Sequence, residues 1–243
     1  MIIQRLNENH LTRVCQLIQQ DSYQSFLQHT IYSLKSITNF LRKRLTDSEQ
    51  FFYGAIENGR LIGFCHIVLQ EHNVFLNHIA VDETEMNKGI GKKLLNFFIS
   101  FEFKGQEFKQ RALKVDSRNV KAMQWYLKNN FKLVGSSPVT RLEFQKKSLV
   151  ENDFYSELED PNQYREFGFS YINFECANFG VIGTNLINVP ENKLFLLERF
   201  MHKYTFSSFV ISIDLQTILN HFPMLEFTNS ECWEIYTLVY KNA

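Results

Sequence analysis

Hydrophobic and polar positions change their period several times along the first part of the chain, and each change predicts an element. An apolar run at 2–6 predicts a short strand, and apolar residues at helical spacing predict helices at 7–21 and 32–45. The stretch 51–70 holds two apolar runs around Asn58-Gly59, a dipeptide that suits the positive φ of a tight turn. It therefore predicts a β-hairpin.

The same pattern continues with strands and helices in alternation. Further strands are expected at 73–81, 112–116, 131–135 and 139–144, and further helices at 92–103 and 119–129. The resulting order is βααβββαβαββ, which is typical of an α/β protein whose helices pack on a mixed sheet.

A polar and charged stretch at 145–163 is interpreted as a linker. It divides the chain into a domain at 1–147 and a smaller α/β domain at 148–243. The expected elements of the second domain are strands at 170–177, 208–214 and 233–240 and helices at 192–204 and 215–222. Because 210–222 loosely echoes 113–127, two interpretations stay open: a degenerate repeat of half of the first domain, or an unrelated cap that buries a sheet edge.

Composition narrows the class of protein. The chain has 243 residues, of which 44% are hydrophobic and 21% charged, as in a globular protein. Lys+Arg and Asp+Glu both number 26, so there is no global basic field for nucleic acid, and any anion site must be local. No run reaches the roughly 18–20 apolar residues of a membrane span, so a cytoplasmic protein without membrane partners is expected.

The four cysteines are spread singly along the sequence. They lack the paired spacing of a zinc site, and most have apolar neighbours. We therefore expect reduced thiols and no metal site.

The stretch "MNKGIGKKLLNFF" at 86–98 is typical of a phosphate-binding loop, because two glycines lead directly into a predicted helix. Its spacing excludes two nucleotide motifs. A Walker loop aligned on Gly91 would have Met86 in place of its first glycine and Lys93 in place of Ser/Thr. The dinucleotide fingerprint would have Leu94 in place of its third glycine.

A third kind of glycine motif fits. It is written R/Q-x-x-G-x-G/A, follows a strand that ends like "L-A-V" and precedes an apolar helix, as does "IAVDETEMNKGIGKKLL" at 79–95. A second signature, N-x-x-A-x-x-x-Y followed by Phe, appears as Asn119, Ala122, Tyr126 and Phe131. With both signatures, residues 1–147 resemble the GNAT superfamily of acetyl-CoA-dependent N-acetyltransferases, and the resemblance says nothing about the rest of the chain.

The resemblance implies a GNAT-like fold and acetyl-CoA as cosubstrate. The residues that it assigns to acetyl-CoA are Ile79, Ala80, Val81, Met86, Asn87, Lys88, Gly89, Ile90, Gly91, Lys92, Asn119 and Tyr126. The two glycines let consecutive amides approach a pyrophosphate, and the following helix adds its positive end. Met86 replaces the usual Arg or Gln, which removes a side-chain contact but leaves the backbone donors of 87–91.

The resemblance also suggests how the reaction proceeds. An amine attacks the thioester directly, a main-chain N–H near Val81 stabilises the oxyanion, and Tyr126 protonates the departing thiolate. Tyr126 is thus the candidate general acid.

The general base is less clear. The family's base usually lies at the strand positions held here by Phe75 and Asn77, and His78 has the opposite parity. Unless a bulge changes the alternation, His78 is expected to be structural rather than catalytic. The other candidates near these strand ends are Asp82, Glu83 and Asp116.

The leading hypothesis is an N-acetyltransferase that moves an acetyl group to a primary amine of a small molecule or peptide in a ternary complex. The acceptor would contact the stretch at 21–33, which offers aromatic and hydroxyl groups. The alternative is a catalytically impaired CoA-binding module whose C-terminal domain serves assembly. That domain could also cover the acceptor cleft, belong to a homodimer face or be an ordinary core.

Overall fold

The computed structural model describes residues 1–20, 27, 30–34, 36–143, 158–167, 169–175, 177–182, 185–187, 195–196, 208–211, 213–222 and 227–241. The chain forms two compact units. Unit 1 contains Met1–Gln28, Ile37–Gly135 and Tyr236–Ala243, and unit 2 contains His29–Ser36 and Ser136–Ile235.

Unit 1 is a mixed α/β unit, as the sequence predicts. Its elements are β1 (Ile2–Arg5), η1 (Glu8–His10), α1 (Leu11–Ile18), α3 (Ile37–Leu45), β2 (Gln50–Glu57), β3 (Arg60–Gln70), β4 (Asn73–Val81), η3 (Glu83–Glu85), α4 (Ile90–Ile99), β5 (Gln110–Asp116), α5 (Val120–Lys128) and the first part of β6 (Phe131–Glu143). Strands β1 to β4 pair antiparallel in sequence order, and β5 pairs parallel with β4. The predicted helix at 32–45 begins later than expected, after the short turn η2 (Ile31–Ser33).

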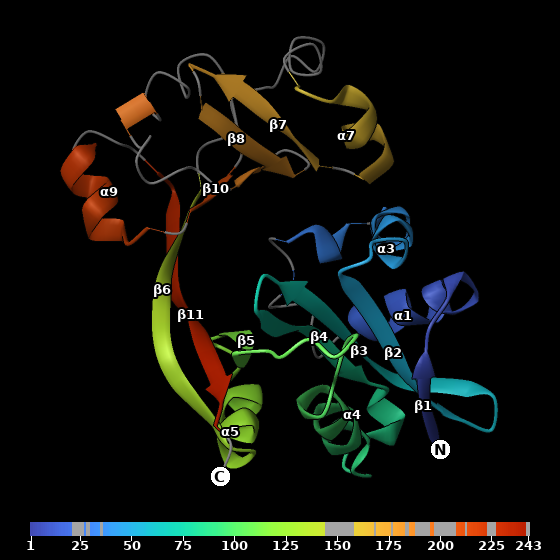
Figure 1. Ribbon diagram of the computed structural model, residues 1–243. Coiled ribbons are helices and arrows are strands. Elements are labelled where there is room, and N and C mark those ends of the chain that lie inside the picture. The colour runs from blue at the N-terminus through green and yellow to red at the C-terminus, as the bar shows by residue number, and fades with distance from the viewer. Residues whose placement is uncertain are drawn as a thin grey trace. The chain divides into compact units, whose positions relative to one another are not determined.

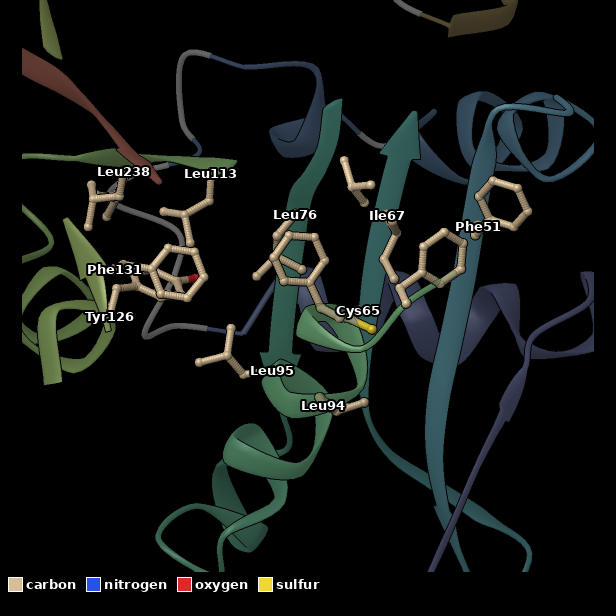
Figure 2. Packing of buried hydrophobic residues seen from close by; sticks show 14 of the residues in the cluster. Phe51, Cys65, Ile67, Leu76, Leu94, Leu95, Leu113, Tyr126, Phe131 and Leu238 are labelled. Atoms are coloured by element: carbon tan, nitrogen blue, oxygen red, sulfur yellow. The ribbon is translucent and has the colours of Figure 1, made fainter. Parts of the chain in front are cut away.

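Helices α4 and α5 cover one face of this sheet. Leu94 and Leu95 of α4 and Tyr126 of α5 share an apolar cluster with Cys65 of β3 and Leu76 of β4 (Figure 2). Helices α1 and α3 contact β3 and β2, and their buried residues lie outside this cluster. The two faces of the sheet therefore have separate cores.

The C-terminal strand completes unit 1. The sheet order is β1-β2-β3-β4-β5-β11-β6, so the end of β11 (Asn229–Tyr240) lies between β5 and β6 (Figure 1). Leu238 is fully buried in the same cluster as Leu113 and Phe131, and the Lys241 N–H donates to the Asn130 carbonyl at 3.0 Å. Unit 1 thus includes residues from beyond the predicted boundary at 147.

The two strands predicted around Ser136–Pro138 are in fact one strand, β6. The prediction was wrong because it took the proline as a strand end. On its outer side β6 pairs with β10 (Ser208–Ile211) only from Thr140 to Glu143. A proline is tolerated beside such an unpaired edge because it needs no ladder hydrogen bond from its nitrogen there.

Unit 2 has a sheet in the order β11-β6-β10-β9-β8-β7. Its further elements are α7 (Pro161–Phe167), β7 (Phe169–Phe174), β8 (Ala177–Ile182), β9 (Asn185–Ile187) and α9 (Leu215–His221). The strand predicted at 170–177 is a hairpin of β7 and β8, which turns at Glu175 with φ of 49°. Most of the helix predicted at 192–204 lies outside the described residues, and α7 begins inside the predicted linker.

The strand pairing of unit 2 repeats that of unit 1. Strands β7–β8 and β8–β9 are antiparallel and β9–β10 parallel, in the order seen for β2–β3, β3–β4 and β4–β5. A short helix follows the last strand in both units, capped by Asn119 in one and Asp214 in the other. This order favours the degenerate repeat over the unrelated cap.

Among the described residues, no helix is long and apolar enough to cross a membrane.

Candidate functional site

Strands β4 and β5 part halfway along their length. Their parallel ladder joins Asn73–Leu76 to Gln110–Leu113, while β4 continues to Val81 and β5 to Asp116. Beyond the last pair the two strands no longer pair with each other. Ile79 and Val81 direct their backbone groups away from β3, because the Asp82 N–H bonds the Ile62 carbonyl of β3 and this direction alternates along a strand. The backbone of Ala80 therefore faces β3, and the Val81 carbonyl accepts from Gln20.

A β-bulge marks the place where the strands part. His66 of β3 pairs with His78, but the next residue, Ile67, pairs with Leu76, so Asn77 is an extra residue in β4. The bulge puts His78 on the same face as Phe75, whereas unbroken alternation would put it on the opposite face. Unbroken alternation therefore predicts the wrong face for His78, and the bulge that would keep His78 a catalytic candidate is present.

The loop after β4 ends in the N-terminus of α4. Asn87 and Gly89 have φ of 64° and 79°, and Gly89 is the N-cap residue. The first amides of a helix have no intrahelical acceptor, so those of Ile90, Gly91 and Lys92 can bind an anion together with the helix dipole. Met86, Asn87, Lys88 and Gly89 are exposed beside them.

Gly91 lies in the first turn of α4, close to two side chains. A Cβ built at Gly91 would be 3.6 Å from Trp125 and 3.7 Å from Val81, which are ordinary van der Waals distances. The fold itself therefore does not require glycine here. Glycine leaves room beside the end of β4.

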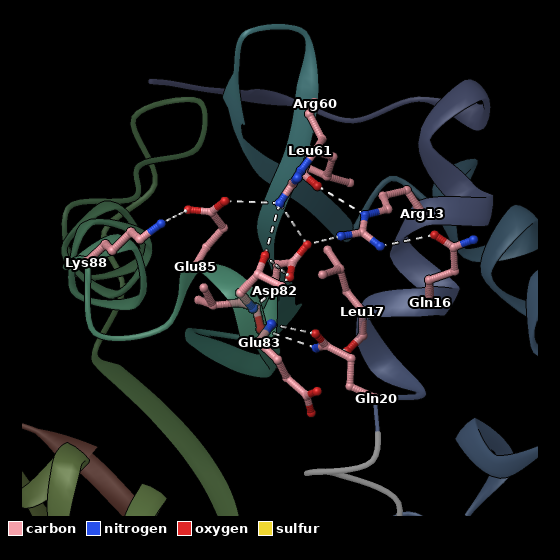
Figure 3. Close-up of polar contacts among 12 residues, drawn as sticks. Arg13, Gln16, Leu17, Gln20, Arg60, Leu61, Asp82, Glu83, Glu85 and Lys88 are labelled. Atoms are coloured by element: carbon pink, nitrogen blue, oxygen red, sulfur yellow. Dashed lines mark hydrogen bonds and ion pairs between the residues drawn. The ribbon is translucent and has the colours of Figure 1, made fainter.

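A group of ion pairs fixes the loop (Figure 3). Asp82 pairs with Arg13 of α1 and, at 3.1 Å, with Arg60 of β3, and Arg60 also pairs with Glu85 at 3.1 Å. Burial opposes ionisation of Asp82, but hydrogen bonds from Thr84 and then the two guanidinium groups outweigh it and lower the pKa of Asp82. The loop is thus anchored to α1 and β3.

Lys88 takes part in this group of ion pairs. Its Nζ lies 2.8 Å from Glu85 Oε2, although its side chain is exposed. A phosphate would have to share Lys88 with Glu85, so Lys88 contributes less free charge than the sequence suggests.

Gln20, two residues after the end of α1, bonds the last residue of β4 and the loop that follows it. Its Nε2 donates to the Val81 carbonyl at 3.2 Å, and its Oε1 accepts from the Glu83 N–H at 2.8 Å (Figure 3). Sequence reasoning missed Gln20 and Arg13, because each acts on a partner more than 60 positions away and no local spacing signals it.

Tyr126 and Asn119 lie on α5, on the face shared with α4. The Asn119 Oδ1 caps α5 by accepting from the Ala122 N–H at 3.1 Å. Tyr126 is 7% exposed, and its ring packs against Trp125 and Phe131 with centroids 5.0 and 5.7 Å away. Within the signature, Asn119 thus caps the start of α5, and Tyr126 is buried in the cluster that includes Leu113 of β5.

His66 of β3 and His78 of β4 are paired across neighbouring antiparallel strands, and both are neutral at pH 7. The ring of His78 stacks on Phe64 with centroids 5.6 Å apart, and the ring of His66 stacks on Phe52 at 3.9 Å. Burial lowers the pKa of His78 to about 4. Burial, then the neighbouring His78 and Arg44, lowers the pKa of His66 to about 3.

These shifts predict a fall in stability on mild acidification. Each histidine is neutral in the folded state but protonated in the unfolded state below its unfolded pKa of about 6.5. Between pH 6 and 5 the free energy of unfolding should therefore fall by about 1.4 kcal/mol per pH unit for each of them. Urea unfolding across that range measures the slope, and the variant His66→Phe should lose about half of it. An equal slope in both proteins would contradict the assignment.

The carboxylates of the other candidate bases either bond arginine side chains or belong to an exposed residue. Asp82 bonds Arg13 and Arg60, and both carboxylate oxygens of Asp116 accept from Arg118, at 2.9 and 2.7 Å. Glu83 is exposed. Among these candidates, His78 lies next to the bulge, and its ring is neutral at pH 7 but less basic than that of an exposed histidine.

In the described part of the chain, no group of three or more His, Cys, Asp or Glu residues is placed to hold a metal ion.

Comparison with known proteins identifies the class. Residues 11–131 match the model of the acetyltransferase (GNAT) family. A presumed acetyltransferase from Thermoplasma acidophilum has the same fold over 100% of both chains, with 14% identity and a TM-score of 0.63. No curated protein sequence matches the chain.

Two further structures share about half of the chain. The PaiA N-acetyltransferase of Thermoplasma acidophilum, solved with coenzyme A, has 22% identity and a TM-score of 0.46 over 55% of this chain and 92% of its own. The ribosomal-protein-S18-alanine N-acetyltransferase of Escherichia coli has 19% identity and a TM-score of 0.42 over 56% of this chain and 80% of its own. Through residues 11–131, the chain belongs to the acetyltransferase (GNAT) family of acyltransferases.

Proposed function

We propose that the protein transfers an acetyl group from acetyl-CoA to a primary amine of a small molecule or peptide, by direct attack in a ternary complex. The observation that carries this proposal is that three structural features follow one another from β4 to the start of α4. The β4 bulge, the parting of β4 from β5, and the glycine-capped start of α4 follow one another within residues 77–91.

These features suit the parts of acetyl-CoA. The first amides of α4 and the left-handed Gly89 would bind the pyrophosphate, and the backbone groups of Ile79 and the Val81 N–H would bind the amides of the pantetheine arm. The thioester would then lie near the bulge, where the strands begin to part.

The two candidate catalytic side chains lie on opposite faces of the sheet. Tyr126 belongs to the cluster under α4 and α5, whereas His78 stacks on Phe64 on the other face. A phenol is protonated at pH 7 and can give its proton to the departing thiolate. Neutral His78 would act as a relay that passes the proton of the attacking amine to water, because its lowered pKa makes it too weak a base to keep that proton at pH 7.

Gly91 provides a test of acetyl-CoA binding that spares the fold. The variant Gly91→Ala should keep or slightly raise the melting temperature, because alanine favours helix and its Cβ makes only ordinary contacts. It should weaken acetyl-CoA binding about tenfold or more, because the methyl group occupies space that the cofactor needs. Calorimetric titration measures both proteins.

The matched control is Gly135→Ala, since a Cβ at Gly135 would meet nothing within 4 Å and its φ is not positive. It should leave the affinity for acetyl-CoA unchanged. Equal affinities in all three proteins would mean that the ligand does not approach Gly91.

Release of free thiol from acetyl-CoA tests the transfer itself. The panel contains spermidine, phenethylamine, lysine amide and a short peptide with an alanine N-terminus, each with the full chain and acetyl-CoA. Thiol release with one amine class, matched by acetylated product, supports the proposal and names the acceptor class. Acetyl-CoA binding without thiol release on any amine would instead support the CoA-binding module.

A further inference from the structure

A chain of four side chains joins the loop before β2 to the bulge in β4. Gln50 Nε2 donates to Asp47 Oδ2 at 2.9 Å, and Gln50 Oε1 lies 3.0 Å from His66 Nε2. Asn77 Nδ2 lies 3.1 Å from His66 Nδ1. Gln50 and His66 are 8% and 2% exposed, whereas Asp47 is partly exposed and Asn77 exposed at the two ends.

The carboxylate of Asp47 fixes the direction of every bond in this chain. An ionised carboxylate only accepts, so Gln50 must turn its NH₂ toward Asp47 and its oxygen toward His66. His66 must then carry its proton on Nε2, which leaves Nδ1 as an acceptor for the Asn77 NH₂. The lowered pKa of His66 agrees with a ring that holds one proton.

Asp47 and His66 are themselves held in place. Asp47 Oδ1 accepts from the Glu49 N–H at 2.9 Å, which orients the carboxylate within its own turn. The His66 ring is nearly parallel to Phe52, with 12° between the planes. The bond to Asn77 therefore starts from a rigid donor–acceptor chain.

Asn77 is the extra residue of the bulge, where the ladder between β3 and β4 is interrupted. We propose that the Asp47–Gln50–His66 chain positions the β4 bulge through the Asn77 side chain, and with it His78 and the backbone of Ile79, for attack on the acyl group. These are positioning residues. The proposal rests on the proposed function, because the shape of the bulge matters for turnover only if the thioester lies beside it.

Two variants break the chain at different points without removing its packing. His66→Phe keeps the stacking on Phe52 but removes both ring nitrogens, and Gln50→Met keeps a similar volume but removes the bonds to Asp47 and His66. The matched control is His72→Gln, which changes an exposed histidine next to the same strand. All three proteins are first compared with wild type by thermal unfolding.

Imidazole ¹⁵N spectra of the wild type should show His66 as the Nε2–H tautomer. In both variants, amide exchange at Asn77–Ile79 should accelerate about tenfold relative to Val74–Leu76, as loss of a hydrogen bond at the bulge requires. With the best acceptor of the amine panel, kcat should fall about tenfold while KM for acetyl-CoA stays within about twofold. His72→Gln should match the wild type in all three measurements.

An Nδ1–H tautomer, or unchanged exchange at the bulge in both variants, would overturn the positioning role. So would an equal kcat in wild type and variants. If no amine in the panel is acetylated, the proposed function fails, whereas the tautomer and exchange measurements still decide whether the chain holds the bulge.

Discussion

A chain that ends after residue 147 is expected to yield no folded acetyltransferase unit, although it contains every residue of both GNAT signatures. The missing strand β11 lies inside the sheet, between β5 and β6. Its removal would expose the edges of both neighbours and take Leu238, which is fully buried, out of the core. Soluble yield, circular dichroism and acetyl-CoA binding of the truncated and full chains measure the effect.

A shortened chain that keeps this strand is the control. Residues 1–135 are joined to 236–243 through an Asn-Gly turn, so that β6 and β11 form a hairpin within unit 1. This hairpin variant should be more soluble than the chain 1–147 and should bind acetyl-CoA. A folded chain 1–147 that binds acetyl-CoA as tightly as the full chain would contradict the assignment of β11 to unit 1.

Single substitutions in the full chain also test whether β11 belongs to the core of unit 1. Leu238→Ala should lower the free energy of unfolding by about 2–5 kcal/mol, as for other fully buried leucines. Val134→Ala on the neighbouring strand should change it by less than about 0.5 kcal/mol, because Val134 is 55% exposed. Similar losses for the two variants would mean that Leu238 is not part of the core.

The second large effect is expected at Tyr126. Tyr126→Phe should lower kcat about 100-fold, because general acid catalysis to a departing thiolate typically contributes a factor of this size. The aromatic ring keeps its contacts with Trp125 and Phe131, so binding of acetyl-CoA and the melting temperature should change little. Steady-state kinetics with the best amine of the panel and calorimetric titration separate the two quantities.

Tyr240→Phe is the matched control for this substitution. Tyr240 packs on the same apolar cluster, with its ring 5.5 Å from Phe131, but it lies on β11 and not in the signature. Loss of its hydroxyl should leave kcat unchanged. The acid role of Tyr126 would be refuted by a full kcat in Tyr126→Phe, or by an equal loss in both variants.

The order of elements in unit 1 could be predicted because local patterns determine it. The Asn58-Gly59 turn, the apolar run of β4 and the apolar face of α4 each lie within a short window of sequence. The glycine motif was also local, since Gly89 caps the helix that follows it directly. These signals sufficed to recognise the family.

What the sequence did not reveal depends on partners that are far apart. The bulge at Asn77 appears only in the register between β3 and β4, and a single strand gives no sign of an extra residue. The chain from Asp47 to His66 and the contact of Gln20 with Val81 likewise join separate elements. The place of β11 in unit 1 needs the sheet order, because strand pairing between distant segments has no local signature.

Thermal unfolding of the full chain with and without acetyl-CoA tests the central claim most directly, namely that the glycine-capped start of α4 and the parted strands bind this cofactor. At about 100 times its Kd, the ligand should raise the melting temperature by about 5 °C or more. ADP alone should give a smaller shift, since it lacks the pantetheine arm that the parted strands would bind. No shift with acetyl-CoA at millimolar concentration, or equal shifts with both ligands, would contradict the account.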